Sequence, residues 1–223
     1  MTMRSLVATS ARAVWPLNKA PRAAAPHSGF TLVEVLVALL VMAVMAGMAW
    51  QGVDGIVRTR NATQARLEQA LRLNTVIAQW DQDLAAIQTS AFVQKALMFD
   101  GATLRLTRRT PSGLQVVAWS LRGNGEQTAW VRWAGPSVTT SRELQESWLH
   151  SFQLQANEPG ALRTLPGLSG WQVYFYRIGD NNWSNAQSSD PVSPAPKGVR
   201  VVLSFAPGSG INGELRRDTL VGP

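Results

Sequence analysis

The feature that most constrains this 223-residue chain is segment 35–53, which contains no charged residue and no proline. As an α-helix it would be roughly 28 Å long at about 1.5 Å per residue, close to the hydrocarbon thickness of a bilayer. An acidic residue, Glu34, stands directly before it. Because an acidic side chain costs about 2.5–3.5 kcal/mol at the bilayer centre and less near the surface, such a residue indicates function. The sequence therefore predicts a membrane-spanning helix with a carboxylate that needs a partner.

The charges on either side of this segment predict its orientation. Residues 1–29 contain no acid, and their cations are Arg4, Arg12, Lys19 and Arg22. The residues that follow the segment are mixed in sign: Asp54, Arg58 and Arg60. The positive-inside rule then predicts a single-pass protein with a cytoplasmic N-terminus and the rest of the chain on the other side of the membrane. Without the leader cations, the net charge falls from +7 to +3, which is typical of a solvated basic face rather than of nucleic-acid binding.

The residues around Glu34 resemble the class-III prepilin signal of type IV pilins and type II secretion pseudopilins. The matching positions are Gly29, Phe30, Thr31, Leu32 and Glu34. The resemblance implies that a prepilin peptidase cleaves after Gly29 and that the new amino terminus, Phe30, is N-methylated. It also implies that the Glu34 carboxylate meets the Phe30 ammonium of a neighbouring subunit, so that a charge in an apolar filament core gains a partner.

Two other interpretations of the segment are possible. It could be an ordinary signal-anchor helix with an accidental glutamate, but the match around Gly29 disfavours this. It could be a secretory signal cleaved after Ala49, but its hydrophobic region would be too long and would carry a charge. The leader also departs from the family pattern, because Pro26, His27 and Ser28 precede the glycine where relatives often have Lys or Arg.

The helix is expected to continue beyond the apolar segment to about residue 88. No proline occurs between Pro26 and Pro111, and apolar positions recur with a helical period. The stripe expected to be buried is Leu67, Ala70, Asn74, Ile77, Trp80, Leu84 and Ile87. The opposite, polar face is expected to carry Arg58, Arg66, Arg72, Gln79, Gln82 and Asp83. We therefore divide the chain into a leader (1–29), a membrane or filament-core helix (30–53), its amphipathic continuation (54–88) and a globular domain (89–223).

The globular domain changes to a period of two, which is typical of strands. The expected strands are 104–106, 115–121, 128–133, 148–154, 171–176, 199–205 and 215–221, and turn residues separate them. No alternation of strands with helices is found, so the predicted class is α+β, with a long N-terminal helix packed on an antiparallel β-sheet domain.

The sequence offers little for catalysis. It contains no cysteine and two histidines, His27 in the leader and His150 in an expected strand, and we find no nucleophile elbow, Walker loop or dinucleotide fingerprint. We therefore expect no enzyme activity and no cofactor. Asp180 and Asp190, with the polar residues between them, are a weak calcium candidate, and an Asx-rich turn is the favoured alternative.

Three arginines raise a nucleic-acid alternative. Arg105, Arg108 and Arg109 could contact DNA, as in a pilin for DNA uptake, but a solvated strand face is the favoured interpretation.

Four segments resemble the J-type minor pseudopilin of type II secretion. They are 48–55, the strand region 108–117, segment 170–176 and segment 196–203. The resemblance implies a structural subunit at the tip of the pseudopilus that helps initiate assembly for export of folded proteins across the outer membrane. It implies as partners the I-, K- and H-type minor pseudopilins, the major pseudopilin, the prepilin peptidase and the inner-membrane assembly platform. The K-type is disfavoured, since it lacks a glutamate at the fifth mature position, and I-type subunits are typically shorter.

The alternative function is a minor type IV pilin for adhesion, twitching or DNA uptake. Such pilins frequently have a C-terminal disulfide loop, which a chain without cysteine cannot form.

Overall fold

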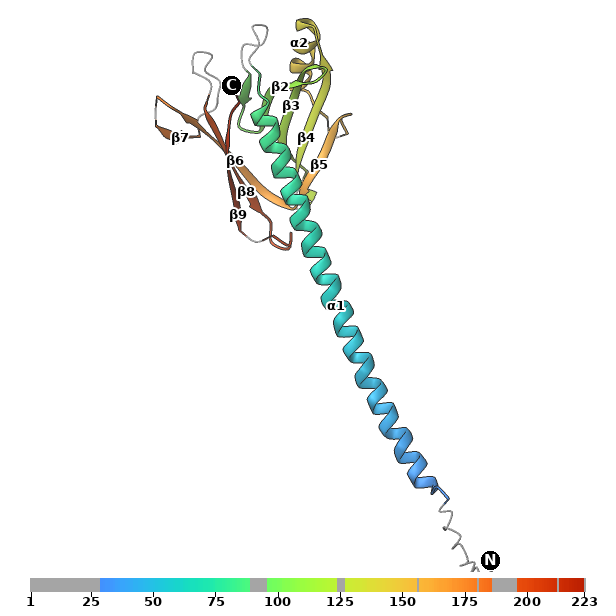
Figure 1. Cartoon of the computed structure of the whole chain (residues 1–223). Helices are drawn as coiled ribbons and strands as arrows, with labels where there is room; N and C mark the ends of the chain where they lie inside the picture. The colour runs from blue at the N-terminus through green and yellow to red at the C-terminus, as the bar shows by residue number, and fades with distance from the viewer. Residues whose placement is uncertain are drawn as a thin grey trace, which may run out of the picture. The chain divides into compact units, whose positions relative to one another are not determined.

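A computed structural model describes residues 29–88, 96–123, 127–155, 157–179, 181–185, 196–211 and 213–222. The chain divides into two compact units, Met1–Ile56 and Val57–Pro223. Helix α1 (Leu32–Ala85) has 54 residues and contributes to both units (Figure 1). This confirms the predicted long N-terminal helix, which ends a few residues before the expected position.

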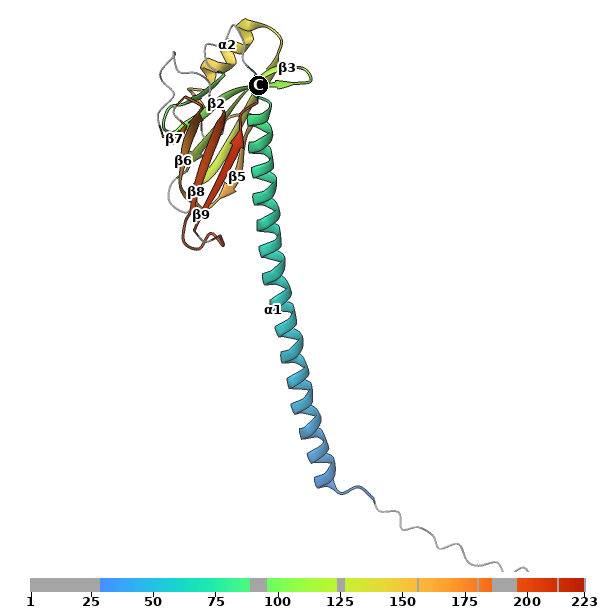
Figure 2. The same ribbon diagram turned by 60° about the vertical axis from the view of Figure 1, so that its left-hand side comes forward.

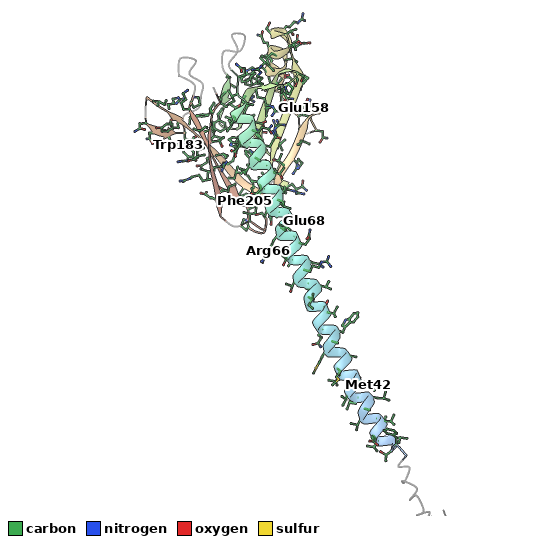
Figure 3. The ribbon with its side chains drawn as sticks, viewed as in Figure 1. Met42, Arg66, Glu68, Glu158, Trp183 and Phe205 are labelled. Atoms are coloured by element: carbon green, nitrogen blue, oxygen red, sulfur yellow. The ribbon has the colours of Figure 1, made fainter. Side chains whose placement is uncertain are left out.

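In the first unit, the described residues before Asp54 are all exposed. The helix here is apolar around its whole circumference, so it has no polar face to turn toward water. In Figure 3 the side chain of Met42 projects from the ribbon of this segment. A helix of this kind requires an apolar environment, either a bilayer or other protein chains.

The second unit contains two antiparallel sheets. The first has the order β1-β2-β3-β4-β5, and its strands follow one another along the chain. They are β1 (Leu97–Phe99), β2 (Thr103–Thr110), β3 (Gly113–Arg122), β4 (Ala129–Val138) and β5 (Ala161–Pro166). The second sheet has the order β7-β6-β8-β9. Its strands are β6 (Leu168–Arg177), β7 (Asn182–Ser184), β8 (Gly198–Phe205) and β9 (Glu214–Leu220). The predicted α+β class, a long helix packed on antiparallel sheets, is confirmed.

One predicted strand is wrong. Most of segment 148–154 follows or ends helix α2 (Ser141–His150), which connects β4 and β5. Thr140 caps this helix: its Oγ1 accepts a hydrogen bond from the Glu143 backbone N–H at 3.3 Å and donates one to the Glu143 carboxylate at 2.6 Å. This Thr-x-x-Glu spacing is a capping box, a local helix signal that outweighs the short apolar alternation after it.

The main core lies between the two sheets and the C-terminal part of α1. One cluster joins strands of both sheets to Val76, Trp80 and Leu84 of the helix and to Ile87, which follows the end of the helix. Trp80 contacts Trp119 and Trp130, with ring centroids 5.6 Å and 5.1 Å away. The predicted stripe is therefore confirmed at Trp80, Leu84 and Ile87, while Ile77 is partly buried.

The same stripe was predicted to include Leu67, Ala70 and Asn74, and this is wrong: all three are exposed, Leu67 by 52%. The helix reaches the strands only from about Gln69, whose side-chain N–H donates to the Ser209 carbonyl at 2.5 Å. The helical repeat of apolar residues in α1 thus extends farther toward the N-terminus than the part of the helix that is buried.

Helix α2 forms an outer layer on the first sheet. Its Leu144 packs with Val116, Ala118 and Trp133, which point away from α1. Figure 1 shows α2 beside β3 and β4, in agreement with this cluster. The first sheet is therefore covered on both faces.

Candidate functional site

The predicted assembly site begins at the N-terminus of α1. The Glu34 backbone N–H donates to Thr31 Oγ1 at 3.2 Å and to the Thr31 carbonyl at 3.1 Å. Thr31 therefore caps the helix, and Glu34 stands in the first helical turn, where a carboxylate is favoured by the helix dipole. The prepilin-like residues consequently combine a helix start with a negative charge.

The side chains at this site face outward. Phe30 is 82% exposed and Glu34 is also exposed. Within the part of the chain that the structure describes, no hydrogen bond or ion pair to the Glu34 carboxylate is found. The described residues therefore leave the charge of this carboxylate without compensation.

Gly29 has no structural reason to be a glycine. A Cβ added there would meet no atom within 4 Å, and its φ is not in the left-handed region. Gly222 provides the contrast, because a Cβ at that position would lie 2.1 Å from the Ala85 carbonyl oxygen. The close packing of the fold therefore explains why residue 222 is a glycine, whereas the presence of a glycine at position 29 needs another explanation.

The end of α1 contains a site that the sequence interpretation missed. Asp83 was expected on the polar face of the helix, but it is 0% exposed. Arg132 donates to both of its oxygens, at 2.7 and 2.9 Å, and Arg108 donates to Oδ1 at 2.7 Å. The Trp119 indole N–H and the Gln79 amide add bonds of 2.9 and 3.0 Å.

These five hydrogen bonds make Asp83 a buried anchor between α1 and strands β2, β3 and β4. Two guanidinium groups balance the carboxylate, which a buried charge requires. A signal in the sequence could have identified it: Asp83 follows Trp80 by three residues and precedes Leu84, so it lies on the buried face.

A second carboxylate joins the same helix to the other sheet. Asp81 accepts hydrogen bonds from Arg217 at 2.5 and 3.2 Å and from the Thr219 hydroxyl at 2.7 Å, both on β9. The hydrogen bond with Asp81 raises the pKa of Arg217 above its ordinary value. Figure 2 shows β9 beside the C-terminal part of α1. Asp81 and Asp83 therefore attach one helix to both sheets.

The three arginines considered for DNA contact do not form one solvated face. Arg105 is buried, pairs with Asp100 and lies 4.0 Å from the Phe152 ring centroid. Arg108 is bound to Asp83, and only Arg109 is exposed. The expectation of a solvated arginine face was wrong, because Arg105 is buried beside Phe152 and pairs with Asp100, and Arg108 points toward the buried Asp83.

The Asp100 pair also has an electrostatic consequence. Burial raises the pKa of Asp100, but the hydrogen bonds from Arg105 and from two backbone N–H groups outweigh it, and the pKa is lowered.

The remaining candidates give no catalytic arrangement. His150 lies at the end of α2 rather than in a strand, and its ring contacts the Glu158 carboxylate at 2.7 Å. This hydrogen bond lowers the pKa of Glu158. Asp180 and Asp190, the calcium candidates, lie outside the described residues. Among the described residues, no group of three or more His, Cys, Asp or Glu side chains could hold a metal ion.

Comparison with known proteins adds one finding. Residues 25–50 match the family model of the prokaryotic N-terminal methylation motif. No curated protein matches the chain. Helix α1 is also long and apolar enough near its N-terminus to cross a membrane. The motif supports a structural protein of the type IV pilin and pseudopilin class, and together with the apolar helix it fits anchoring in a membrane.

Proposed function

We propose that this chain is a J-type minor pseudopilin of a type II secretion system, which helps start the pseudopilus that exports folded proteins across the outer membrane. The observation that carries the proposal is a methylation motif at the start of a 54-residue helix. The C-terminal part of this helix packs in the core of an antiparallel β domain. The J-type resemblance adds support, since its segments 108–117, 170–176 and 196–203 overlap β2 and β3, β6 and β8.

In this proposal, the prepilin peptidase recognises Gly29 and cleaves before Phe30, whose new amino group is then methylated. Gly29 supports this role because the fold itself does not require a glycine there. Replacing Gly29 with Val should therefore leave the leader attached without changing the folding of the β domain. N-terminal sequencing of the membrane-extracted wild type should begin at methylated Phe30, and a start at any other residue would refute the cleavage position.

The proposed role of Glu34 is to bind the Phe30 ammonium of a neighbouring subunit. A carboxylate and an ammonium that pair in an apolar filament core each offset part of the other's desolvation cost. The pair would also fix the axial position of one subunit against the next. The domain is periplasmic in this proposal, and its partners are the I-, K- and H-type minor pseudopilins, the major pseudopilin and the assembly platform.

A gene disruption distinguishes this function from that of a minor type IV pilin. We expect the disrupted strain to retain folded exoproteins in the periplasm and to keep twitching and DNA uptake. Crosslinking of the full chain in membranes should recover I- and K-type subunits. Loss of twitching or DNA uptake with normal protein export would replace the secretion function with the type IV pilin function.

A further inference from the structure

The outer face of the second sheet differs from that of the first. Val173, Phe175, Val199 and Val201 point into the core between the sheets. Side chains alternate along a strand, so Tyr174, Tyr176 and Arg200 point outward. Among the described residues, no helix or strand covers this outer face, whereas α2 covers the first sheet.

One row of residues on this face contains a gap. Trp183, Tyr176, Gly198 and Leu220 are paired in this order across β7, β6, β8 and β9. Because Gly198 has no side chain, the edge of the Trp183 ring can lie over it: a Cβ at position 198 would be only 3.3 Å from Trp183 Cη2. A cavity of about 440 Å³ lies here, and we call it the Gly198 pocket. Ile178 and Val221 also line it, so most of its lining is apolar.

The walls of the pocket include strongly exposed apolar groups. Leu220 is 80% exposed, and Ile178 is exposed as well. The Trp183 ring, labelled in Figure 3, is covered on one side by the Arg200 guanidinium at 4.1 Å and lies 5.5 Å from the Tyr176 ring. These two contacts hold the Trp183 ring in the wall of the pocket.

Among the described residues in and beside the pocket, three cations outnumber two carboxylates. Asp218 lines the pocket, but Arg200 binds both of its carboxylate oxygens at 2.6 Å and neutralises it. Lys197 also lines the pocket, and the exposed Arg216 precedes Asp218 by two residues on the same face of β9. Glu214 lies farther along β9 and accepts a hydrogen bond from Ser204. A partner segment that complements this charge would be acidic.

We propose that the Gly198 pocket is a docking site for an acidic segment of a partner protein, which inserts one large apolar side chain between Tyr176 and Leu220. Tight binding by a single anchor requires a concave apolar cavity, and charged groups around it give orientation and fast association. Both are present here, and the proposal does not depend on the function proposed above.

The test uses the full chain in nanodiscs, with empty nanodiscs to correct for peptide partitioning. The probes are short fluorescent peptides with one central Phe or Ala, flanked by Asp, Asn or Lys. Fluorescence anisotropy should show the tightest binding for the Phe peptide with Asp flanks. Equal binding of the Asp- and Lys-flanked peptides, or of the Phe and Ala peptides, would overturn the proposal.

Variants localise the binding. Gly198→Val displaces the Trp183 ring, because a Cβ at position 198 would lie 3.3 Å from it, and Leu220→Asp places a charge in the wall of the pocket. Each should weaken binding of the Asp-flanked Phe peptide by about thirtyfold, the effect of a hot-spot residue. Leu162→Asp on β5 is the matched control, because Leu162 is 62% exposed and lies in the other sheet. Two results would contradict the proposed occupant. One is unchanged peptide binding by the Leu220→Asp variant. The other is self-association of the chain that Leu220→Asp abolishes while peptide binding stays the same.

Discussion

Glu34 and Asp83 are carboxylates on the same helix with opposite surroundings. Glu34 is exposed at the start of α1, and the described residues provide its carboxylate with no partner. Asp83 is buried near the end of α1 and accepts five hydrogen bonds, three of them from arginines. The difference shows that one helix has two kinds of surface: its C-terminal part is packed against its own domain, whereas its N-terminal part exposes apolar side chains that fit a membrane.

The largest expected effect comes from removing the buried carboxylate. Asp83→Ala leaves the guanidinium groups of Arg108 and Arg132 buried without their counter-ion. Breaking a buried ion pair in this way costs about 3–5 kcal/mol. The melting temperature of the full chain in detergent, followed by the near-ultraviolet signal of the tryptophan cluster, should fall strongly. Glu34→Ala is the matched control and should melt like the wild type; equal melting of both variants would remove the contrast.

A pair of leucines tests the boundary between the two environments. Leu84 is fully buried, so Leu84→Ala should lower the free energy of unfolding by about 2–5 kcal/mol. Leu67 lies on the same helix but is exposed, and Leu67→Ala should change it by less than about 0.5 kcal/mol. Denaturant titration of both variants measures the difference. A loss of stability in Leu67→Ala similar to that in Leu84→Ala would move the boundary toward the N-terminus.

Glu34 should affect assembly rather than folding. Glu34→Ala should still insert in the membrane, because removing a charge favours insertion. Crosslinking to neighbouring subunits should fall about tenfold, equivalent to about 1.4 kcal/mol. Glu34→Gln separates charge from size, and we expect it to behave like the Ala variant. Wild-type crosslinking in both variants would rule out charge pairing at this position.

The smallest expected effect is a pH dependence in the second sheet. The hydrogen bond from Arg200 lowers the pKa of Asp218, so the folded state favours the ionised carboxylate. Its contribution is fully present above the ordinary Asp pKa of about 3.9 and is lost as the pH falls through the lower folded value. Because the Asp218 side chain is 46% exposed, we expect less than about 1 kcal/mol. The difference in melting temperature between wild type and Asp218→Asn should therefore shrink below about pH 4. A difference that grows below this pH would contradict a stabilising effect of the ionised Asp218.

Local pattern was sufficient for much of the fold. The alternation at Val173 and Phe175, and at Val199 and Val201, predicted strands whose inner faces are indeed buried. The absence of proline and the apolar period predicted α1. The prepilin-like residues also match a methylation motif, although cleavage after Gly29 and pairing of Glu34 stay predictions.

Partners distant in sequence explain most of what local pattern missed. Asp83 was placed on a polar face because its main partner, Arg132, lies 49 residues away, although its spacing from Trp80 indicated the buried side of the helix. Arg105 was expected in solvent although its ion-pair partner, Asp100, is only five residues away; its hydrogen bond to the Ser151 carbonyl, 46 residues away, had no local signal. Helix α2 was a different error, since Thr140 and Glu143 formed a capping signal that was present and overlooked. The apolar period did not locate the first helical contact at Gln69 either, because contact depends on where the turn at Ser209 lies.

The contact between Asp81 and Thr219 joins residues that are 138 positions apart. A ribosome completes α1 long before it synthesises β9, so Trp80 and Leu84 exist without their covering strands during most of translation. Contacts over such separations slow folding, and the uncovered apolar surface favours aggregation while it persists. The hydrogen bonds between Asp81 and β9 can therefore form only after almost the whole chain has been made.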